Sequence, residues 1–199
     1  MLYAKILAMA KDPQIVKTTS IPGLLYIERP VFHDHRGFFH EVFRLNELEE
    51  KIGFKFKPVQ WNHSLSKPKV IRAIHTEAWN KLVYPATGKM FAAFVDVRPK
   101  SKTFGRVEKV IFDNTLKNSL RRAVFIPAGV GNSICALGKE PVHYFYLVDA
   151  YWDDKKARGI AWDDPDLAIQ WPVKKPIISE RDKNNPTLRE LFPKKFRKK

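Results

Sequence analysis

Residues 60–82 read QWNHSLSKPKVIRAIHTEAWNKL, and this stretch combines a strand-like pattern with a dense set of polar side chains. Its middle is apolar apart from Arg72, and His75 follows directly. In an unbulged strand Arg72 and Ile74 share one face, and Ala73 and His75 share the other. Burying a guanidinium or an imidazole without a partner is costly. These two side chains therefore either pair with other groups or line a cavity that holds a polar ligand.

An isolated histidine in an apolar strand is most often a satisfied core residue. The nearby Arg72 and Lys81, the latter six residues after His75, weaken that interpretation. Two cations beside a histidine suit an anionic or anion-forming ligand.

The runs around this stretch predict an all-β fold. Turn signals such as Thr87-Gly88 and Pro127-Ala128-Gly129 separate short apolar segments at close intervals, which is typical of a sandwich or barrel. The segments are LLYIERPVF (24–32), FFHEVF (38–43), KMFAAFVDV (89–97), RVEKVIF (106–112), RRAVFIP (121–127) and VHYFYLVDAYW (142–152). A jelly roll is the simplest closed arrangement of such strands.

Two helices are predicted. Leu45, Leu48 and Ile52 have helical spacing, and Gly53 ends that helix. Near the C-terminus, Asn185-Pro186 predicts a helical turn through Leu191, with the asparagine as N-cap.

The chain has 199 residues, of which 44% are hydrophobic and 13% aromatic, and this favours one folded domain over residues 1–199. Residues 1–20 are predicted to be an N-terminal extension with a possible short strand, and residues 193–199 a basic tail. One cysteine, Cys135, excludes an intramolecular disulfide. The N-terminal MLYAKILAMAKD is not typical of a signal peptide, and no apolar run approaches the roughly 20 residues of a spanning helix. A cytoplasmic protein without a membrane span is expected.

The formal net charge of +15 raises the possibility of nucleic-acid binding. Residues 172–199 contain ten Lys or Arg against three Asp or Glu, so nearly half of the excess lies at the C-terminus. Terminal basic segments are usually solvated extensions. The remaining charge is dispersed without an aromatic–basic cluster, and no nucleic-acid partner is predicted.

A series of motifs in one order resembles the dTDP-4-dehydrorhamnose 3,5-epimerase family across about residues 20–192. The motifs are DxRGxFxExF (34–43), QxNxSxS (60–66), RxxH (72–75), KLV (81–83), FVDVRPKSKTFG (94–105), FIPAGVGN (125–132), Tyr146 with Tyr151, AWDDPDLAIQWP (161–172) and SERD (179–182). The resemblance implies a cupin-type jelly-roll barrel (a double-stranded β-helix) with a few short helices, usually a homodimer with exchanged N-terminal strands. It also implies an isomerase that uses no cofactor and no metal, and that epimerises a dTDP-linked 4-keto-6-deoxyhexose in dTDP-rhamnose biosynthesis.

The resemblance also implies a set of site residues. His75 resembles the general base, Asp182 its carboxylate partner, Lys81 the cation at the C4 oxygen, and Tyr146 the acid on the opposite face. The expected substrate contacts are Arg36, Phe39, Glu41, Gln60, Asn62, Arg72, Asn132 and Tyr151. Of these, Arg36, Phe39 and Glu41 resemble nucleotide-sugar contacts, some of which are made to the neighbouring subunit's ligand.

Two positions depart from the family pattern. The usual RGLH is RAIH, and the usual GFAHGF is GVGNSI, so Asn132 replaces a histidine that faces the sugar. Epimerisation at a single carbon, C3 or C5, of a related nucleotide sugar is therefore a second reading.

The chemistry is consistent with the residues themselves. A proton next to a ketone is lost only if the enolate is stabilised, and Lys81 supplies a positive charge for this. His75 suits a base near neutral pH, and a carboxylate such as Asp182 fixes its tautomer. Inversion needs a second acid, for which Tyr146 is the candidate. Without the resemblance, Tyr146 would be read as a core-edge tyrosine and Asp182 as a surface carboxylate.

Two other classes compete with the epimerase. A metal-dependent cupin is suggested by His33-Asp34-His35 and His75-Thr76-Glu77, but Asn132 is a poor transition-metal ligand. A non-catalytic sugar-nucleotide binding module would keep the arginines but would not need the base, the lysine and the tyrosine together.

Overall fold

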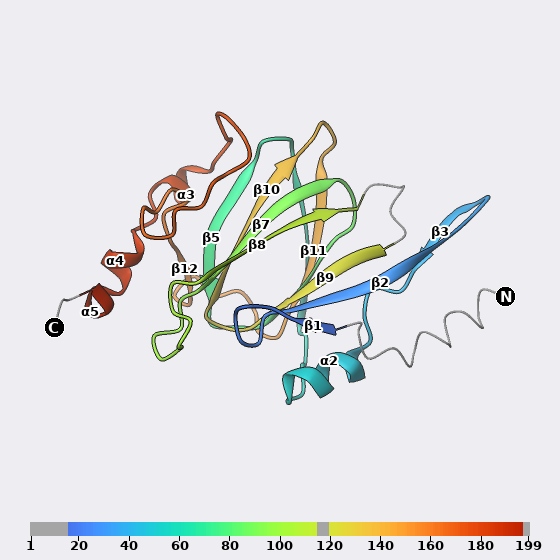
Figure 1. Cartoon of the computed structure of the whole chain (residues 1–199), viewed down its shortest axis with the longest axis horizontal. Coiled ribbons are helices and arrows are strands. Elements are labelled where there is room, and N and C mark those ends of the chain that lie inside the picture. The colour runs from blue at the N-terminus through green and yellow to red at the C-terminus, as the bar shows by residue number, and fades with distance from the viewer. Residues whose placement is uncertain (1–15, 115–119, 197–199) are drawn as a thin grey trace.

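Two antiparallel sheets face each other in the computed structural model, which describes residues 16–114 and 120–196 (Figure 1). The larger sheet has the order β1-β2-β9-β6-β11-β4, with β3 paired to β2, and the smaller has the order β12-β5-β10-β7-β8. This is the all-β jelly-roll barrel with a few short helices that the sequence predicts.

The strands and helices are short and follow one another closely. The strands are β1 (Val16–Thr18), β2 (Leu25–Asp34), β3 (Gly37–His40), β4 (Gln60–Ser66), β5 (Ile71–Glu77), β6 (Lys81–Pro85), β7 (Lys89–Asp96), β8 (Val107–Asp113), β9 (Leu120–Ile126), β10 (Val130–Leu137), β11 (Val142–Val148) and β12 (Ala157–Gly159). The helices are α2 (Leu45–Ile52), α3 (Glu180–Lys183), α4 (Leu188–Leu191) and α5 (Pro193–Phe196).

The main core lies between the two sheets. Phe94 and Phe112 of the smaller sheet are almost fully buried against Tyr26 and Val124 of the larger one. Burying each large apolar side chain contributes roughly 1.5–3 kcal/mol relative to exposing it, so this layer holds the sheets together. A cavity lined mostly by polar side chains opens between β5, β6, β10 and β11.

Helix α2 covers part of the outer face of the larger sheet. Leu48 is fully buried there against Ile27 and Phe125, which point outward from β2 and β9. Gly53 ends the helix in the left-handed conformation, with φ of +78°, which a residue without a Cβ adopts readily. The helix and its end are as predicted from the leucine spacing.

The C-terminal segment covers the outer face of the smaller sheet. Ile160, Leu167 and Leu188 are buried there in one cluster. This packing carries α3 to the edge of β5, as the position of the red segments beside β5 shows (Figure 1).

The predicted N-cap of the last helical turn is wrong. Thr187, not Asn185, caps α4: its side chain accepts from the Glu190 amide while Glu190 reaches back to the Thr187 amide. This reciprocal capping box satisfies two amides at once, whereas Asn185 instead donates to the carbonyl of Ala73.

The two predicted terminal segments are partly visible. Within residues 1–20, the predicted strand is β1, and residues 1–15 lie outside the described part of the chain. In the predicted basic tail, Lys194 and Lys195 are exposed, but Phe196 packs on Phe104. Among the described residues, no helix is long and apolar enough to cross a membrane.

Candidate active site

A β-bulge in β5 decides which side chains reach the barrel interior. Asn132 of β10 pairs with His75, and Ile134 pairs with Arg72, so two residue steps on β10 match three on β5. The extra residue lies at Ala73 or Ile74 and reverses the alternation beyond it. Arg72 and His75, which an unbulged strand would place on opposite faces, therefore line the same cavity.

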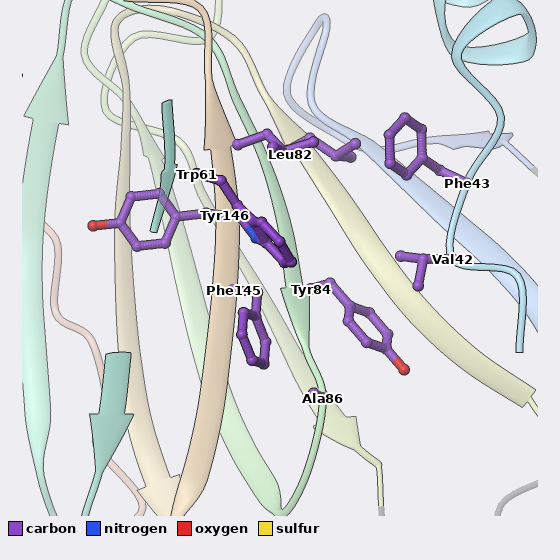
Figure 2. A pocket seen from close by; sticks show the side chains of 9 residues that line it. Val42, Phe43, Trp61, Leu82, Tyr84, Ala86, Phe145 and Tyr146 are labelled. Carbon is purple, nitrogen blue, oxygen red and sulfur yellow. The ribbon is translucent and has the colours of Figure 1, made fainter. Parts of the chain in front are cut away.

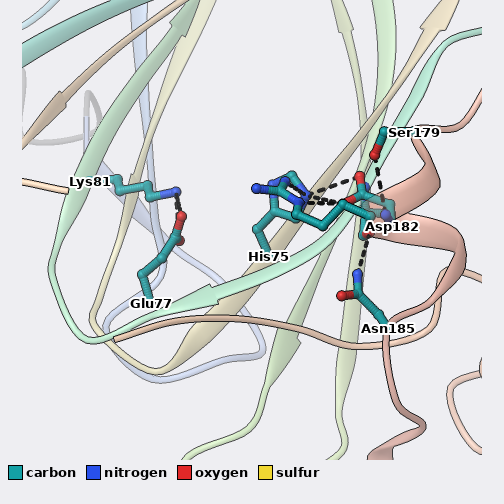
Figure 3. Close-up of polar contacts among 8 residues, drawn as sticks. His75, Glu77, Lys81, Ser179, Asp182 and Asn185 are labelled. Carbon is teal, nitrogen blue, oxygen red and sulfur yellow. Dashed lines mark hydrogen bonds and ion pairs between the residues drawn. The ribbon is translucent and has the colours of Figure 1, made fainter. Parts of the chain in front are cut away.

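Asp182 of α3 accepts hydrogen bonds from two polar groups at the bulge, the Ala73 amide and the His75 ring. The amide of Ala73 donates to Asp182 Oδ2 at 3.3 Å, and His75 Nε2 lies 2.9 Å and 3.0 Å from the two carboxylate oxygens (Figure 3). Asp182 is only 2% exposed, and Ser179 Oγ accepts its backbone amide at 3.1 Å. His75 and Asp182, the predicted base and its predicted carboxylate partner, are thus held by the same local distortion of the sheet.

The protonation of this pair follows from the carboxylate. Burial by itself would raise the pKa of Asp182, but the hydrogen bond and charge of His75, the Ala73 amide and the Arg181 guanidinium outweigh it and lower the pKa below its usual range. An ionised carboxylate only accepts hydrogen bonds, so His75 Nε2 carries the ring proton. The free lone pair of His75 is then on Nδ1. The exposed Arg181 Nη2 also lies 2.9 Å from Nε2, but since a guanidinium only donates, this contact is not a hydrogen bond while Nε2 carries the proton.

Lys81 and Tyr146 belong to the opposite sheet. Lys81, the first residue of β6, is 6% exposed, and its Nζ lies 5.4 Å from the centre of the Tyr146 ring. Burial lowers the pKa of Lys81, although the neighbouring Glu77 carboxylate raises it. Burial, with a contribution from Glu77, raises the pKa of Tyr146. A phenol with a raised pKa is protonated at neutral pH and available as a proton donor.

Two of the predicted substrate contacts line the cavity together with His75, Lys81 and Tyr146, whereas Asp182 lies behind His75 and does not line it. They are Arg72, whose guanidinium donates to Ser66 Oγ at 2.9 Å and to the Leu65 carbonyl at 3.1 Å, and the nearly buried Asn132. The cavity has a volume of about 180 Å³. A second cavity of about 230 Å³ adjoins it and shares His75 and Glu77.

Three further predicted contacts lie near the cavity but do not line it. Gln60 and Asn62 are on β4, where Gln60 Nε2 donates to Asn62 Oδ1 at 2.7 Å. Gln60 also accepts the Trp152 amide at 3.2 Å. Tyr151 is 73% exposed, and it is the next residue, Trp152, that lines both cavities.

The remaining three predicted contacts are not brought to this cavity within one chain. Arg36 and Phe39 are on the β2–β3 hairpin, which projects on the far side of the barrel from β5 (Figure 1). The Arg36 side chain is 74% exposed and pairs with Asp34 at 2.7 Å. Glu41 follows the hairpin and accepts hydrogen bonds from Arg29 and Arg44.

Six cavity residues received no role in the predicted epimerase site. They are Ser64, Glu77, Ile134, Tyr144, Trp152 and Arg181. Two had a signal in the sequence: Glu77 is two residues after His75 on the same strand, and Arg181 adjoins Asp182. The others enter the site only through strand pairing and the fold of the C-terminal segment.

The ligand pairs suggested for a metal-dependent cupin are separated in the structure. His33 belongs to the projecting hairpin, and Glu77 forms an ion pair with Lys81. Across residues 16–114 and 120–196, no three His, Cys, Asp or Glu side chains are grouped so as to hold a metal ion.

Comparison with known proteins identifies the family. The sequence profile described as dTDP-4-dehydrorhamnose 3,5-epimerase matches residues 18–190. The chain belongs to the dTDP-4-dehydrorhamnose 3,5-epimerase family. A family member from Shigella flexneri, named dTDP-4-dehydrorhamnose 3,5-epimerase, is 37% identical over 83% of this chain and 91% of its own length.

Two other relatives within the family are informative. A dTDP-4-dehydro-6-deoxyglucose 3-epimerase from Streptomyces sp is 36% identical over 85% of this chain and 86% of that enzyme. A 4-keto-6-deoxy sugar epimerase from the novobiocin gene cluster of Streptomyces spheroides has a crystal structure that superposes with a TM-score of 0.84. It is 30% identical and covers 90% of each chain. The resemblance drawn from the motifs is thereby confirmed.

Proposed function

We propose that this chain epimerises dTDP-4-dehydro-6-deoxy-D-glucose at C3 and C5 to dTDP-4-dehydro-L-rhamnose, within dTDP-rhamnose biosynthesis. The observation that carries the proposal is His75 on one wall of the cavity, paired from behind with Asp182, with Lys81 and Tyr146 on the facing wall. Family membership supports the reaction class, since relatives bear the names of 3,5-epimerases.

Each side chain has a distinct role in this reaction. His75 Nδ1 takes the proton from the carbon next to the C4 ketone, and Asp182 stabilises the imidazolium that forms. The Lys81 ammonium stabilises the enolate oxygen, an interaction typically worth about 3–4 kcal/mol in such sites. Tyr146 then donates a proton to the other face of the same carbon. Because His75 and Tyr146 come from different sheets, they approach a sugar between them from opposite sides.

Epimerisation at one carbon is a second candidate, favoured by Asn132. This residue pairs in register with His75 and lines the cavity, and an amide neither takes up nor releases a proton near neutral pH. A Streptomyces relative of similar identity is named a 3-epimerase. The two candidates share the same base, acid and enolate stabiliser, and differ only in the carbons presented to them.

Proton NMR of the purified protein with dTDP-4-keto-6-deoxyglucose in deuterated water tests both candidates. Deuterium at C3 and C5 with formation of the L-rhamno product supports the 3,5-epimerase. Deuterium at a single carbon supports the second candidate. Absence of exchange at either carbon contradicts both, and a non-catalytic binding module would then be the better reading.

We also propose that the chain acts as a homodimer, with the outer face of the β4–β11–β6 region covered by a second copy. Trp61, Phe145 and Tyr84 lie on this face around an apolar pocket of about 480 Å³, while Tyr146 points to the other side of the sheet (Figure 2). Trp61 is 71% exposed in a single chain. A second copy would bury this surface and allow the Arg36 hairpin to reach a neighbouring cavity.

The cytoplasm is the compartment proposed for this enzyme. Cys135 is a free, buried thiol, and burial raises its pKa to about 11, so it is poorly reactive toward oxidants. Together with the single-cysteine composition, this favours a fold that does not depend on disulfide chemistry.

A further inference from the structure

Glu77 occupies a position in the site that neither the motifs nor the proposed reaction accounts for. It is the last residue of β5, two residues beyond His75, so both side chains project from the same face of the strand. It lines both cavities beside His75. A carboxylate at this place faces the substrate region, where the ligand is itself expected to be anionic.

The carboxylate of Glu77 is engaged with Lys81. Lys81 Nζ donates to it at 2.6 Å across the short turn between β5 and β6, as the dashed line in Figure 3 shows. Both side chains are largely buried, with exposed fractions of 8% for Lys81 and 13% for Glu77. An ion pair at this depth is weakly screened by solvent, so the charge of Glu77 acts strongly on Lys81.

An unpaired ammonium at this depth would be costly, and a buried lysine readily becomes neutral. A neutral amine would not stabilise an enolate. The ammonium has three N–H donors, so one directed at Glu77 leaves others for the substrate oxygen. We propose, on the basis of the function proposed above, that Glu77 is a positioning residue that keeps Lys81 protonated and directed toward the sugar's C4 oxygen.

The surroundings of the pair contain further ionisable groups. They are His75 and Arg72 on β5, Tyr144 and Tyr146 on β11, Arg158 on β12 and Arg181 on α3. Glu77 raises the pKa of Lys81 against the effect of burial, and it also raises the pKa of Tyr146. The proposed reaction needs both Lys81 and Tyr146 in their protonated form. Removing the Glu77 charge therefore lowers the pKa values of Lys81 and Tyr146. As pH rises, both groups lose their protons earlier, so the alkaline loss of activity begins at a lower pH than in wild type.

The test compares wild type with Glu77→Gln, which keeps the shape and removes the charge. In protein with isotopically labelled lysine, the side-chain resonance of Lys81 is assigned with a Lys81→Met variant and followed against pH without substrate. We expect Lys81 to titrate about 1–3 pH units lower in Glu77→Gln, the usual effect of losing an adjacent opposite charge. The alkaline limb of kcat/KM should move in the same direction. Glu77→Asp keeps the charge, so its Lys81 titration and its alkaline limb should lie closer to those of wild type than in Glu77→Gln.

Glu50→Gln is the control, because it removes a like charge from an exposed position on α2. It should leave both the Lys81 titration and the alkaline limb unchanged. Lys81 titrating at the same pH in wild type and Glu77→Gln would overturn the proposal, as would a drop in kcat/KM without any movement of the limb. If the wild type does not turn over the sugar, the proposed function fails, and the titration without substrate still decides the role of Glu77.

Discussion

Asp182 shows how a single residue can serve both the fold and the chemistry. Its carboxylate accepts the Ala73 amide, which the bulge removes from the strand ladder, and the His75 ring nitrogen. A buried amide without a partner is costly, so the bulge and the carboxylate depend on each other. The orientation of His75, the proposed base, is therefore coupled to the local stability of β5.

Tyr146→Phe should separate exchange from inversion. The substitution removes the hydroxyl and keeps the ring in its packing against Tyr144. His75, Asp182 and Lys81 remain, so deuterium should still enter the substrate, while inverted product should form about 10²–10⁴-fold more slowly. NMR in deuterated water reports both quantities in one sample. Equal losses of exchange and inversion would show that Tyr146 shapes the cavity instead of donating the proton.

His75→Ala should abolish proton exchange at the sugar and leave nucleotide binding largely intact. In the proposed mechanism the base acts in the transition state, whereas arginines such as Arg72 are proposed to hold the charged part of the ligand in the ground state. Calorimetric binding of dTDP is the second readout. Near wild-type epimerisation by this variant would place the base elsewhere.

Asp96→Asn should remove a defined part of the acid sensitivity of folding. Asp96 is fully buried; burial by itself would raise its pKa, but hydrogen bonds from Arg98, Ser101 and Thr103 outweigh it and lower the pKa to about 2. A carboxyl with a lowered pKa stabilises the fold above pH 3.8, its value in the unfolded chain, and this contribution is lost as pH falls through about 2.

The shift corresponds to about 2 kcal/mol. The difference in unfolding free energy between wild type and Asp96→Asn should be constant above pH 4 and shrink by about this amount toward pH 2. Denaturant titrations at several pH values measure it. A difference that stays constant over the whole range would contradict the assignment.

At the scale of elements, two short C-terminal helices differ in what they carry. Ser179 caps α3, which holds Asp182, and Thr187 caps α4, which holds none of the residues that line the two cavities beside His75. Helices this short are not stable by themselves, so both depend on their caps and on the burial of Asp182 and Leu188.

Ser179→Ala and Thr187→Ala form a matched pair. Each loses an N-cap and should cost about 0.5–2 kcal/mol of unfolding free energy. Only Ser179→Ala should also lower kcat, because fraying of α3 misplaces the carboxylate behind His75. Thermal unfolding and steady-state kinetics on both variants check this. A comparable loss of kcat in Thr187→Ala would mean that the whole C-terminal segment acts as one unit.

At the scale of the molecule, the feature to test is the part of the larger sheet's outer face, over β4, β11 and β6, that a second copy is proposed to cover. Trp61→Lys places a charge in the apolar surface around Phe145 and should convert the proposed dimer to monomer. Ile111→Lys is the control, since Ile111 is 52% exposed on the other sheet. Sedimentation velocity at micromolar concentration separates the two species. A wild-type protein that is already monomeric there would contradict the proposed dimer.

The sequence alone predicted the fold class and helix α2, which the structure confirms, and it named His75, Asp182, Lys81 and Tyr146 as site residues, whose roles stay predictions. Strand-length apolar runs and leucine spacing are local signals, and the motif order is independent of how the strands pair. It did not predict β10, because Gly131, Asn132 and Ser133 interrupt the apolar pattern of a strand whose partners on both sides complete it.

The assembly of the site follows from tertiary contacts. The bulge that places Arg72 beside His75 is a mismatch between two strands far apart in the sequence, and no local pattern encodes it. The pairing of Glu77 with Lys81 likewise depends on the turn between β5 and β6 and on the burial of both side chains. Such contacts are properties of packed surfaces, so the sequence could identify candidate residues but could not predict their geometry.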